Sequence, residues 1–141
     1  MVEEPDLIVE ASPDPRDTDF LEHQINAFNF AVTGIVDWYP VAIFVREPSG
    51  QIVAGVSGGI WAGYLELRSL WVREDLRGRG YGRRLLEAAE REATAHGCDK
   101  VLLDTHDFQA PGFYRRFGYV VFGVFEGIGG QYRRYYMRKD L

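Results

Sequence analysis

Hydrophobic positions along this chain follow two different periods. Apolar residues at alternate or consecutive positions predict strands at 7–9, 41–46, 51–61, 64–72, 101–103, 119–125 and 132–139. Apolar residues three and four apart predict a long helix over 80–96 and an earlier helix that ends at Gly34. The earlier helix is expected to start at one of three capping residues, Asp17, Thr18 or Asp19.

The order of these elements predicts an α+β fold with one strand–helix–strand crossover. Tight turns join the strands of the first half into an antiparallel meander. The long helix then separates 64–72 from the fully apolar run 101–103, a pattern typical of a parallel pair in a covered sheet. A short helix, begun by Pro111 and stopped near Gly118, precedes the last two strands. Without repeats or linkers, the chain is expected to be a single domain, 1–141.

Composition narrows the class of protein. Hydrophobic residues make up 46% of the chain, which is enough for a packed core. The formal net charge of −5 argues against nucleic acid as the main partner, because phosphate binding needs a basic face, and it mildly favours a cationic acceptor such as an amine. The single cysteine, Cys98, and the absence of a signal peptide or membrane-spanning run predict a cytoplasmic protein with no membrane partner. Three histidines without ligand spacing predict no metal site.

Glycines and arginines gather immediately before the long helix, in Arg77-Gly78-Arg79-Gly80-Tyr81-Gly82. Amides at a helix N-terminus are unpaired, glycines let a ligand approach the backbone, and arginines add cationic donors, so this context favours phosphate binding. A P-loop would need Lys and then Ser or Thr after the last glycine, and a dinucleotide fingerprint would need its third glycine one residue later. An arginine–glycine RNA-binding segment would be disordered rather than lead into an amphipathic helix. The remaining alternative is a loop of flexible glycines and solvated arginines.

The spacing Arg77-x-x-Gly80-x-Gly82 resembles the Gln/Arg-x-x-Gly-x-Gly/Ala signature of the GNAT superfamily of N-acetyltransferases. A second segment resembles the family's later motif, a short helix with a tyrosine followed by glycine and an aromatic residue. It contains Asp104-Thr105, Phe108-Gln109-Ala110, Phe113-Tyr114 and Phe117-Gly118-Tyr119. The resemblance is strongest over 52–125, and it points to a small bacterial subgroup of unassigned acceptor.

This resemblance implies both a fold and an activity. The fold is that of acyl-CoA N-acyltransferases, a mixed, mostly antiparallel central sheet with helices on both faces. The activity is transfer of an acetyl group from acetyl-CoA, as co-substrate and without a metal, to a primary amine. The amine would belong to a small molecule or a lysine side chain, and it would attack directly in a ternary complex.

The family's cofactor site maps onto three places in this chain. The loop amides would cradle the pyrophosphate of coenzyme A. The Leu70 amide would polarise the acetyl carbonyl, and the Val72 amide would hold the pantetheine arm in a gap between this strand and the next parallel one. Gln109 would either contact the pantetheine amides or cap the short helix. The implied cofactor-binding residues are Leu70, Trp71, Val72, Arg77, Gly78, Arg79, Gly80, Tyr81, Gly82, Arg83, Gln109 and Tyr114.

Two residues are candidates for proton transfer. The resemblance makes Tyr114 the acid that protonates the leaving thiolate, since a phenol pKa of about 10 lies close to that of a thiol. The alternative is a core ring with a solvated hydroxyl. Glu66 stands six residues before Val72, the offset at which the histone-acetyltransferase-like branch places its general base. Burial in this apolar stretch would raise the pKa of Glu66 toward neutrality, whereas pairing with Arg68 or Arg46 would leave deprotonation to a water chain.

Two other functions are compatible with the same sequence. An acetyl-CoA sensor would keep the fold without the chemistry, and a nucleic-acid binder would use the arginine–glycine loop; the two proton-transfer candidates favour the enzyme. His106 and Asp107 are expected to be loop or acceptor-contact residues, because no Ser or Cys completes a triad with them. Tyr135 and Tyr136 suit either the core or a homodimer contact. The sequence specifies neither the acceptor nor the acyl chain length.

Overall fold

The computed structural model describes residues 3–141, which form two compact units whose boundary in the sequence falls between Val36 and Asp37. The first unit contains α1 (Pro15–Thr33). Asp14 caps this helix by accepting a hydrogen bond of 2.9 Å from Arg16 N, and proline occupies the start of the helix, where its missing N–H costs nothing. Gly34, with φ of 70°, ends the helix in the left-handed conformation, as predicted.

Two predictions for this unit are wrong. The strand predicted at 7–9 does not form, and residues 3–14 contain no strand; three apolar residues followed closely by two prolines give too short a segment for a ladder. The helix begins at Pro15, ahead of the predicted caps Asp17, Thr18 and Asp19, because a proline taken for a breaker occupies the first turn.

No helix within the described part of the chain is long and apolar enough to cross a membrane.

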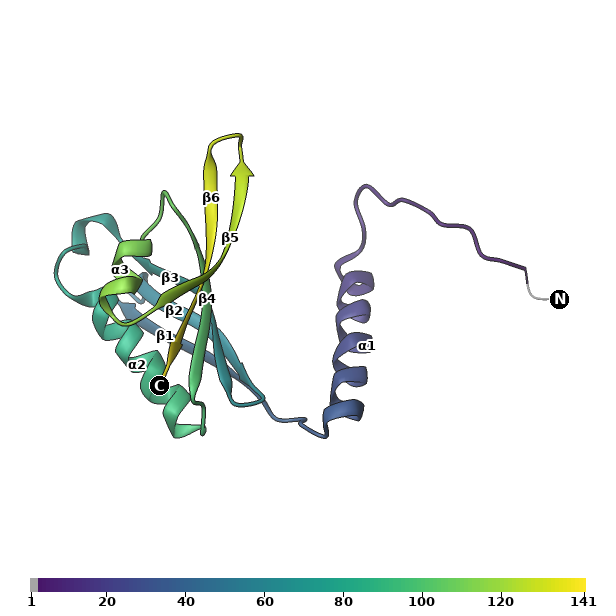
Figure 1. Cartoon of the computed structure of the whole chain (residues 1–141), viewed down its shortest axis with the longest axis horizontal. Helices are drawn as coiled ribbons and strands as arrows, with labels where there is room; N and C mark the ends of the chain where they lie inside the picture. Colours follow the sequence, from purple (N-terminus) through teal and green to yellow (C-terminus); the bar gives the residue numbers. More distant parts are fainter. Residues whose placement is uncertain (1–2) are drawn as a thin grey trace. The chain divides into compact units, whose positions relative to one another are not determined.

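The second unit is a six-stranded sheet with two helices on one face (Figure 1). Its elements are β1 (Trp38–Arg46), β2 (Ile52–Trp61), β3 (Tyr64–Val72), the 3-10 turn η1 (Glu74–Leu76), α2 (Tyr81–Ala95), β4 (Lys100–His106), α3 (Pro111–Arg116), β5 (Val120–Ile128) and β6 (Tyr132–Asp140). The strand order is β1-β2-β3-β4-β6-β5, and only the β3–β4 pair, joined through α2, is parallel. The predicted α+β fold with a mixed, mostly antiparallel sheet is confirmed; helices on both faces stay a prediction, as does the single domain 1–141.

The β4 strand is longer than the predicted run 101–103. It continues through Asp104, Thr105 and His106, which pair antiparallel with residues 134–136 of β6. Backbone pairing with β6 therefore extends the strand beyond its apolar segment and brings polar side chains into the sheet.

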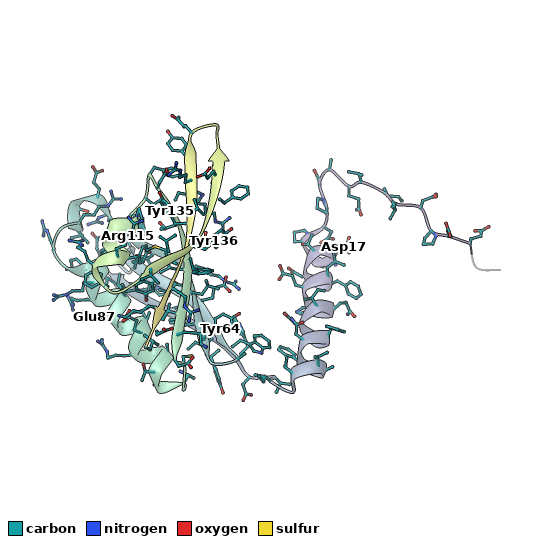
Figure 2. The ribbon with its side chains drawn as sticks, viewed as in Figure 1. Asp17, Tyr64, Glu87, Arg115, Tyr135 and Tyr136 are labelled. Atoms are coloured by element: carbon teal, nitrogen blue, oxygen red, sulfur yellow. The ribbon has the colours of Figure 1, made fainter. Side chains whose placement is uncertain are left out.

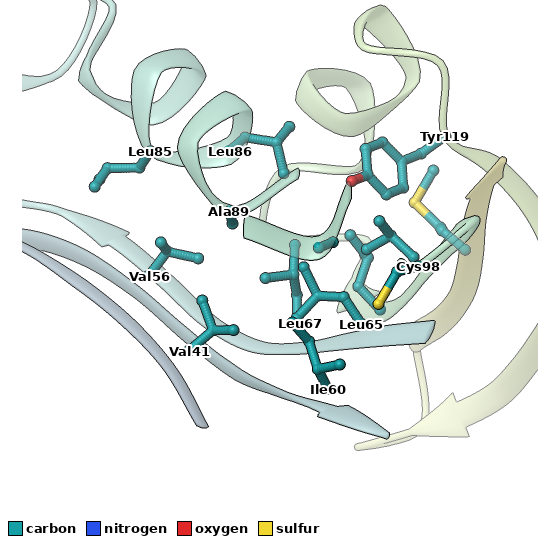
Figure 3. Close-up of a cluster of buried hydrophobic side chains, with 14 of the residues drawn as sticks. Val41, Val56, Ile60, Leu65, Leu67, Leu85, Leu86, Ala89, Cys98 and Tyr119 are labelled. Carbon is teal, nitrogen blue, oxygen red and sulfur yellow. The ribbon is translucent and has the colours of Figure 1, made fainter. Parts of the chain in front are cut away.

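The core of this unit lies between the sheet and α2 (Figure 3). Leu65 of β3 and Val101 of β4 are at most 1% exposed, and they pack in the same cluster as Leu86 and Ala89 of α2. Full burial of a side chain such as leucine contributes about 1.5–3 kcal/mol, so this cluster is the main reason that α2 stays on the sheet.

A polar cluster fixes α2 to the far edge of the sheet. The buried Tyr119 hydroxyl donates to Glu90 Oε1 of α2 at 3.0 Å, and Lys139 Nζ of β6 lies 3.0 Å from both Glu90 oxygens. Burial, followed by the Glu90 charge, raises the pKa of Tyr119 far above its ordinary value. The three side chains thus connect α2, β6 and the start of β5 away from the glycine-rich loop.

Candidate active site

The parallel strands β3 and β4 diverge partway along their length. Their pairing covers only residues 64–66 of β3, opposite 100–102 of β4. Beyond Glu66, β3 continues beside β2, while β4 continues beside β6. The sheet therefore has a gap between β3 and β4, bounded by backbone edges that have no strand partner, of the kind that the family resemblance implies for the pantetheine arm.

A β-bulge determines which side chains of β3 face the helix side. The register with β2 slips at Arg68, which is the extra residue of the bulge. After the slip, Leu70 and Val72 pack toward the same core as the leucines before it. Gly58 of β2 lies opposite the bulge and must be glycine, because a Cβ there would overlap the Glu66 carbonyl oxygen.

The backbone amides of Leu70 and Val72 point into the gap. Arg73 N donates to Val53 O of β2 at 2.9 Å, and successive N–H groups of a strand point to opposite edges. The Trp71 amide therefore also points to β2, whereas those of Leu70 and Val72 point to the edge from which β4 has diverged. Two amide donors on one edge can bind carbonyl groups of a ligand.

The glycine-rich loop leads directly into α2. Gly78 and Gly80 have φ of 74° and 85°, in the left-handed region that favours glycine. Gly80 is the N-cap of α2, and no side chain caps this end of the helix. The amides of the first turn are therefore available to an anion. Arg77 Nε donates to Val72 O at 2.9 Å, which fixes the loop to the end of β3.

An open cavity of about 690 Å³ connects the end of β3 beyond Glu66, the loop and α3. Its lining residues are Leu70, Val72, Leu76, Arg77, Gly78, Gly80, Tyr81, Gly82, Arg83, Ala110, Phe113, Tyr114, Arg116 and Phe117. Nine of the predicted cofactor-binding residues are among them. The cavity runs from the amide donors of β3 to the uncapped helix start, which suits a long ligand with a phosphate end and a carbonyl end.

Tyr114 lies on α3, on the wall of this cavity. Its ring packs edge-on against Phe113 and Tyr119, with ring centroids 5.2 and 5.8 Å away. Burial, and secondarily the charge of Asp104, raise the pKa of the Tyr114 phenol. The phenol is therefore protonated at neutral pH, the state that a general acid requires.

Glu66 is the last residue of β3 paired with β4. Its neighbours Leu65 and Leu67 are buried under α2, so the Glu66 side chain projects from the opposite face of the sheet. The alternative pairing with an arginine does not occur: Arg46 instead donates to Gly50 O, and within residues 3–141 no ion pair involves Glu66 or Arg68. Among residues 3–141, the carboxylate at the mouth of the gap thus has no ion-pair partner.

Three predicted cofactor-binding residues lie outside the cavity lining. Trp71 projects from the other face of β3 and is 49% exposed, and Arg79 is exposed in the loop. Gln109 Oε1 accepts from His106 N at 2.6 Å and from Thr105 Oγ1 at 3.2 Å. This side chain therefore holds the loop after β4 and does not cap α3, whose N-cap has no side-chain hydrogen bond.

The cavity also includes residues that the sequence did not single out for the site. Phe113 of α3 and Phe117 at its C-cap present aromatic rings, and Arg116 adds a cationic side chain. The spacing of four residues between the two phenylalanines signals one apolar helix face. Nothing in the sequence pattern distinguished Arg116, as a residue of the site, from the other arginines of the chain. Among the described residues, no group of three or more His, Cys, Asp or Glu side chains is arranged to hold a metal ion.

Comparison with known proteins gives consistent matches. The sequence matches the acetyltransferase (GNAT) family over residues 6–119. It is 42% identical over 79 residues to blasticidin-S acetyltransferase of Streptomyces morookaense, a match that covers 55% of this chain and only 58% of that protein. It is 33% identical over 97 residues to an acetyltransferase of Agrobacterium fabrum, covering 69% of this chain and 71% of the relative.

A solved structure agrees with the sequence matches. A protein from Agrobacterium tumefaciens, described as an acetyltransferase, superposes with a TM-score of 0.91 at 25% identity, covering 97% of this chain and 100% of that one. The family match spans most of the chain and includes β3, the glycine-rich loop and α3. The chain therefore belongs to the acetyltransferase (GNAT) family and is an acetyl-CoA-dependent N-acetyltransferase.

Proposed function

We propose that this chain acetylates a primary amine of a small molecule, by direct attack of the amine on acetyl-CoA in a ternary complex. One observation carries the proposal: a single cavity joins the uncapped start of α2, the diverging edge of β3 and the Tyr114 ring. Those are the three elements needed to hold a diphosphate, a thioester carbonyl and a leaving sulfur at once.

In this proposal acetyl-CoA lies along the cavity. Its pyrophosphate is bound by amides from Gly78 to Gly82, where the helix dipole and nearby arginines favour negative charge. The pantetheine arm runs beside the Val72 amide, and the acetyl carbonyl accepts from the Leu70 amide. The carbonyl is thereby polarised for attack, because the developing negative charge on its oxygen has a fixed donor.

Tyr114 is the proposed acid for the leaving thiolate. Its position on the cavity wall and its protonated phenol support this role. The raised pKa of Tyr114 makes full proton loss costly, so the phenol is expected to share its proton with the sulfur as the carbon–sulfur bond breaks. Glu66, on the opposite face of the sheet at the mouth of the gap, is the proposed base, directly or through a water molecule.

The small-molecule acceptor is supported by a relative, because blasticidin-S acetyltransferase is 42% identical over the matched 79 residues. The net charge of −5 also favours a cationic amine. A peptide lysine is the second candidate acceptor. A homodimer and a cytoplasmic location stay predictions.

The decisive experiment is a turnover screen with acetyl-CoA and alkyl amines, amino acids, polyamines, aminoglycosides and lysine peptides. Release of coenzyme A and the mass of the acetylated product would be measured together. We expect turnover with at least one small amine. Tight acetyl-CoA binding without turnover of any amine would instead favour the sensor, and turnover confined to lysine peptides would favour a protein acceptor.

A further inference from the structure

We infer that Asp104 binds and orients the ammonium group of the acceptor, so that the site selects amines that are cationic at neutral pH. This inference rests on the proposed acetyl transfer and adds a residue and a substrate class to it. Nothing in the sequence pattern assigned Asp104 a role beyond its place in the later motif.

The position of Asp104 follows from the register of β4. Leu102 is the last β4 residue paired with β3, opposite Glu66, and Asp104 is the next residue on the same face of the strand. Leu103 and Thr105, on the other face, are buried under the helices. Asp104 therefore lies on the face away from α2, just past the point where β3 and β4 diverge, and its side chain remains 34% exposed.

Arg134 of β6 holds the Asp104 carboxylate in one orientation. Arg134 Nε and Nη2 both lie 2.6 Å from Asp104 Oδ2, and the guanidinium also lies over the Tyr136 ring, 5.2 Å from its centroid. Tyr136 is the direct cross-strand partner of Asp104, and it projects from the face opposite its neighbour Tyr135 (Figure 2). Because both Arg134 contacts use Oδ2, the other oxygen, Oδ1, is left to accept from a ligand.

Asp104 adjoins the gap in which the thioester is proposed to lie, because it follows Leu102, the last β4 residue paired with β3. The charge of the Asp104 carboxylate is the second cause, after burial, of the raised pKa of Tyr114, which lies on the helix side of the sheet. A thioester polarised at Leu70, with its sulfur beside Tyr114, would thus present its carbonyl carbon to a nitrogen held at Asp104 Oδ1.

Charged and titratable groups on several elements surround Asp104. They are Glu66 of β3, His106 of β4, Arg134 and Tyr136 of β6, and Tyr114 of α3. Asp104 already accepts from Arg134 through Oδ2, so its carboxylate is suited to binding a second cation through Oδ1. His106 Nδ1 is already 3.1 Å from Gln109 Oε1. Glu66, which has no ion-pair partner among the described residues, remains the proposed proton acceptor.

The proposed reaction is balanced in atoms and charge. The ammonium bound at Asp104 loses one proton, to Glu66 or to water, and its nitrogen attacks the thioester carbon. The carbon–nitrogen bond forms, the carbon–sulfur bond breaks, and the thiolate takes the Tyr114 proton. The second proton leaving nitrogen restores the phenol, so the products are the N-acetylated amine, coenzyme A and one proton. In this scheme Asp104 binds the ammonium group and exchanges no proton.

The test compares Asp104→Asn with wild type on two acceptors of the same carbon skeleton. One is the best alkyl amine from the turnover screen; the other is its alkoxyamine analogue, which is uncharged at neutral pH. We expect Asp104→Asn to raise KM for the alkyl amine by about 10- to 100-fold, the cost of losing a charge-assisted hydrogen bond, while kcat changes by less than about threefold. KM for the alkoxyamine, measured as substrate or as competitive inhibitor, should change by less than about threefold.

Two further variants make the test specific. Arg134→Gln keeps the carboxylate but removes its fixed orientation, and it should raise KM for the alkyl amine by a smaller factor. Asp140→Asn is the matched control, because it removes the carboxylate of another Asp–Arg pair on the same sheet, 2.8 Å from Arg138 Nη2; it should leave both acceptors unaffected. All variants should bind acetyl-CoA as wild type does.

Three results would overturn the inference. The first is an equal rise in KM for both acceptors, and the second is no change for either. The third is a loss of kcat with KM intact, which would make Asp104 a base rather than a binding group. Failure of the proposed acetyl transfer itself is distinguishable, because wild type would then turn over neither acceptor.

Discussion

The start of α2 touches the ring of Phe113 on α3 through Gly82. A Cβ placed on Gly82 would lie 3.2 Å from Phe113 Cζ and 3.3 Å from Cε2, closer than ordinary van der Waals contact. Glycine at this position therefore allows the two helices to approach, and both residues line the cavity. Because Gly82 has no side chain, the two helices can pack closely and a ligand can approach the backbone at the same position.

Gly82→Val should abolish acetyl-CoA binding. The valine branches would displace Phe113 and occupy the space in which a phosphate approaches the first turn of α2. Titration calorimetry with acetyl-CoA measures the effect, and thermal melting shows that the variant is folded. Gly112→Ala is the control, because a Cβ there meets no atom within 4 Å in the same short helix as Phe113. Unchanged affinity in folded Gly82→Val would place the cofactor elsewhere.

Tyr114→Phe should slow the chemical step and leave cofactor binding intact. Removal of a general acid lowers kcat by about 10- to 1000-fold, whereas the ring that packs against Phe113 and Tyr119 is retained. Single-turnover rates and acetyl-CoA affinity are the measurements. Tyr132→Phe, which removes a hydroxyl from the β5–β6 hairpin, is the control. A wild-type single-turnover rate in Tyr114→Phe would make Tyr114 a packing residue.

The Tyr114 phenol should not limit activity below about pH 10, its ordinary pKa. Burial and the Asp104 charge raise the pKa of Tyr114, so the acid form persists through neutral and mildly alkaline pH. The same direction applies to folding stability. The contribution of the Tyr114 phenol to the free energy of unfolding is complete below the pKa that the phenol has in the unfolded chain. It is lost as the pH rises through the higher pKa of the folded protein. The kcat profile of wild type tests this. An alkaline loss of activity near pH 8 that disappears in Tyr114→Phe would contradict it.

Glu90→Ala should destabilise the fold without changing acetyl-CoA affinity. The variant leaves the buried Tyr119 hydroxyl and the Lys139 ammonium without their shared partner, at a cost of about 1–3 kcal/mol in the free energy of unfolding. Urea denaturation gives this difference. Glu92→Ala removes an exposed carboxylate from the same helix and should cost much less. Equal losses in the two variants would show that helix charge, rather than the cluster, matters.

The sequence pattern predicts the bounds of β3 but not which of its residues face the core. Leu65 and Leu67 alternate, but the next core residues are Leu70 and Val72, so one interval is three residues instead of two. That interval is the signature of the bulge at Arg68. The predicted bounds 64–72 are confirmed, but alternation alone would have placed Leu70 on the wrong face.

Long-range partners explain what the sequence left undecided. The loop and α2 were predictable because glycine spacing and helical periodicity are local properties of the chain. The pairing of Asp104 with Arg134 depends on β6 returning beside β4, thirty residues further along the sequence. Likewise, whether Glu66 pairs with an arginine depends on which residues the adjacent strands, β2 and β4, place beside it. Charged side chains of this kind acquire a role only from the sheet order, which no local pattern encodes.

Glu66→Gln gives the most demanding prediction. An alkyl ammonium has a pKa of about 10 and is almost wholly protonated at neutral pH, so a proton must leave before attack. If Glu66 takes it, directly or through water, Glu66→Gln lowers kcat with little change in acetyl-CoA affinity. The defect should shrink as pH rises toward the amine pKa, because the amine then deprotonates without help. The measurement is a pH–rate series for wild type and the variant on one confirmed amine.

A loss of stability is the competing explanation for a lower kcat in Glu66→Gln, and the structure argues against it. Had Glu66 paired with Arg68 or Arg46, the substitution would lower stability; since no such pair exists among the described residues, melting curves of wild type and Glu66→Gln should nearly coincide. A slower variant with an unchanged melting temperature and a pH-dependent defect would therefore reflect lost chemistry. Parallel pH profiles would remove Glu66 from the mechanism. Proton removal would then fall to a water chain or to His106, whose Nε2 is not used in the contact of the ring with Gln109.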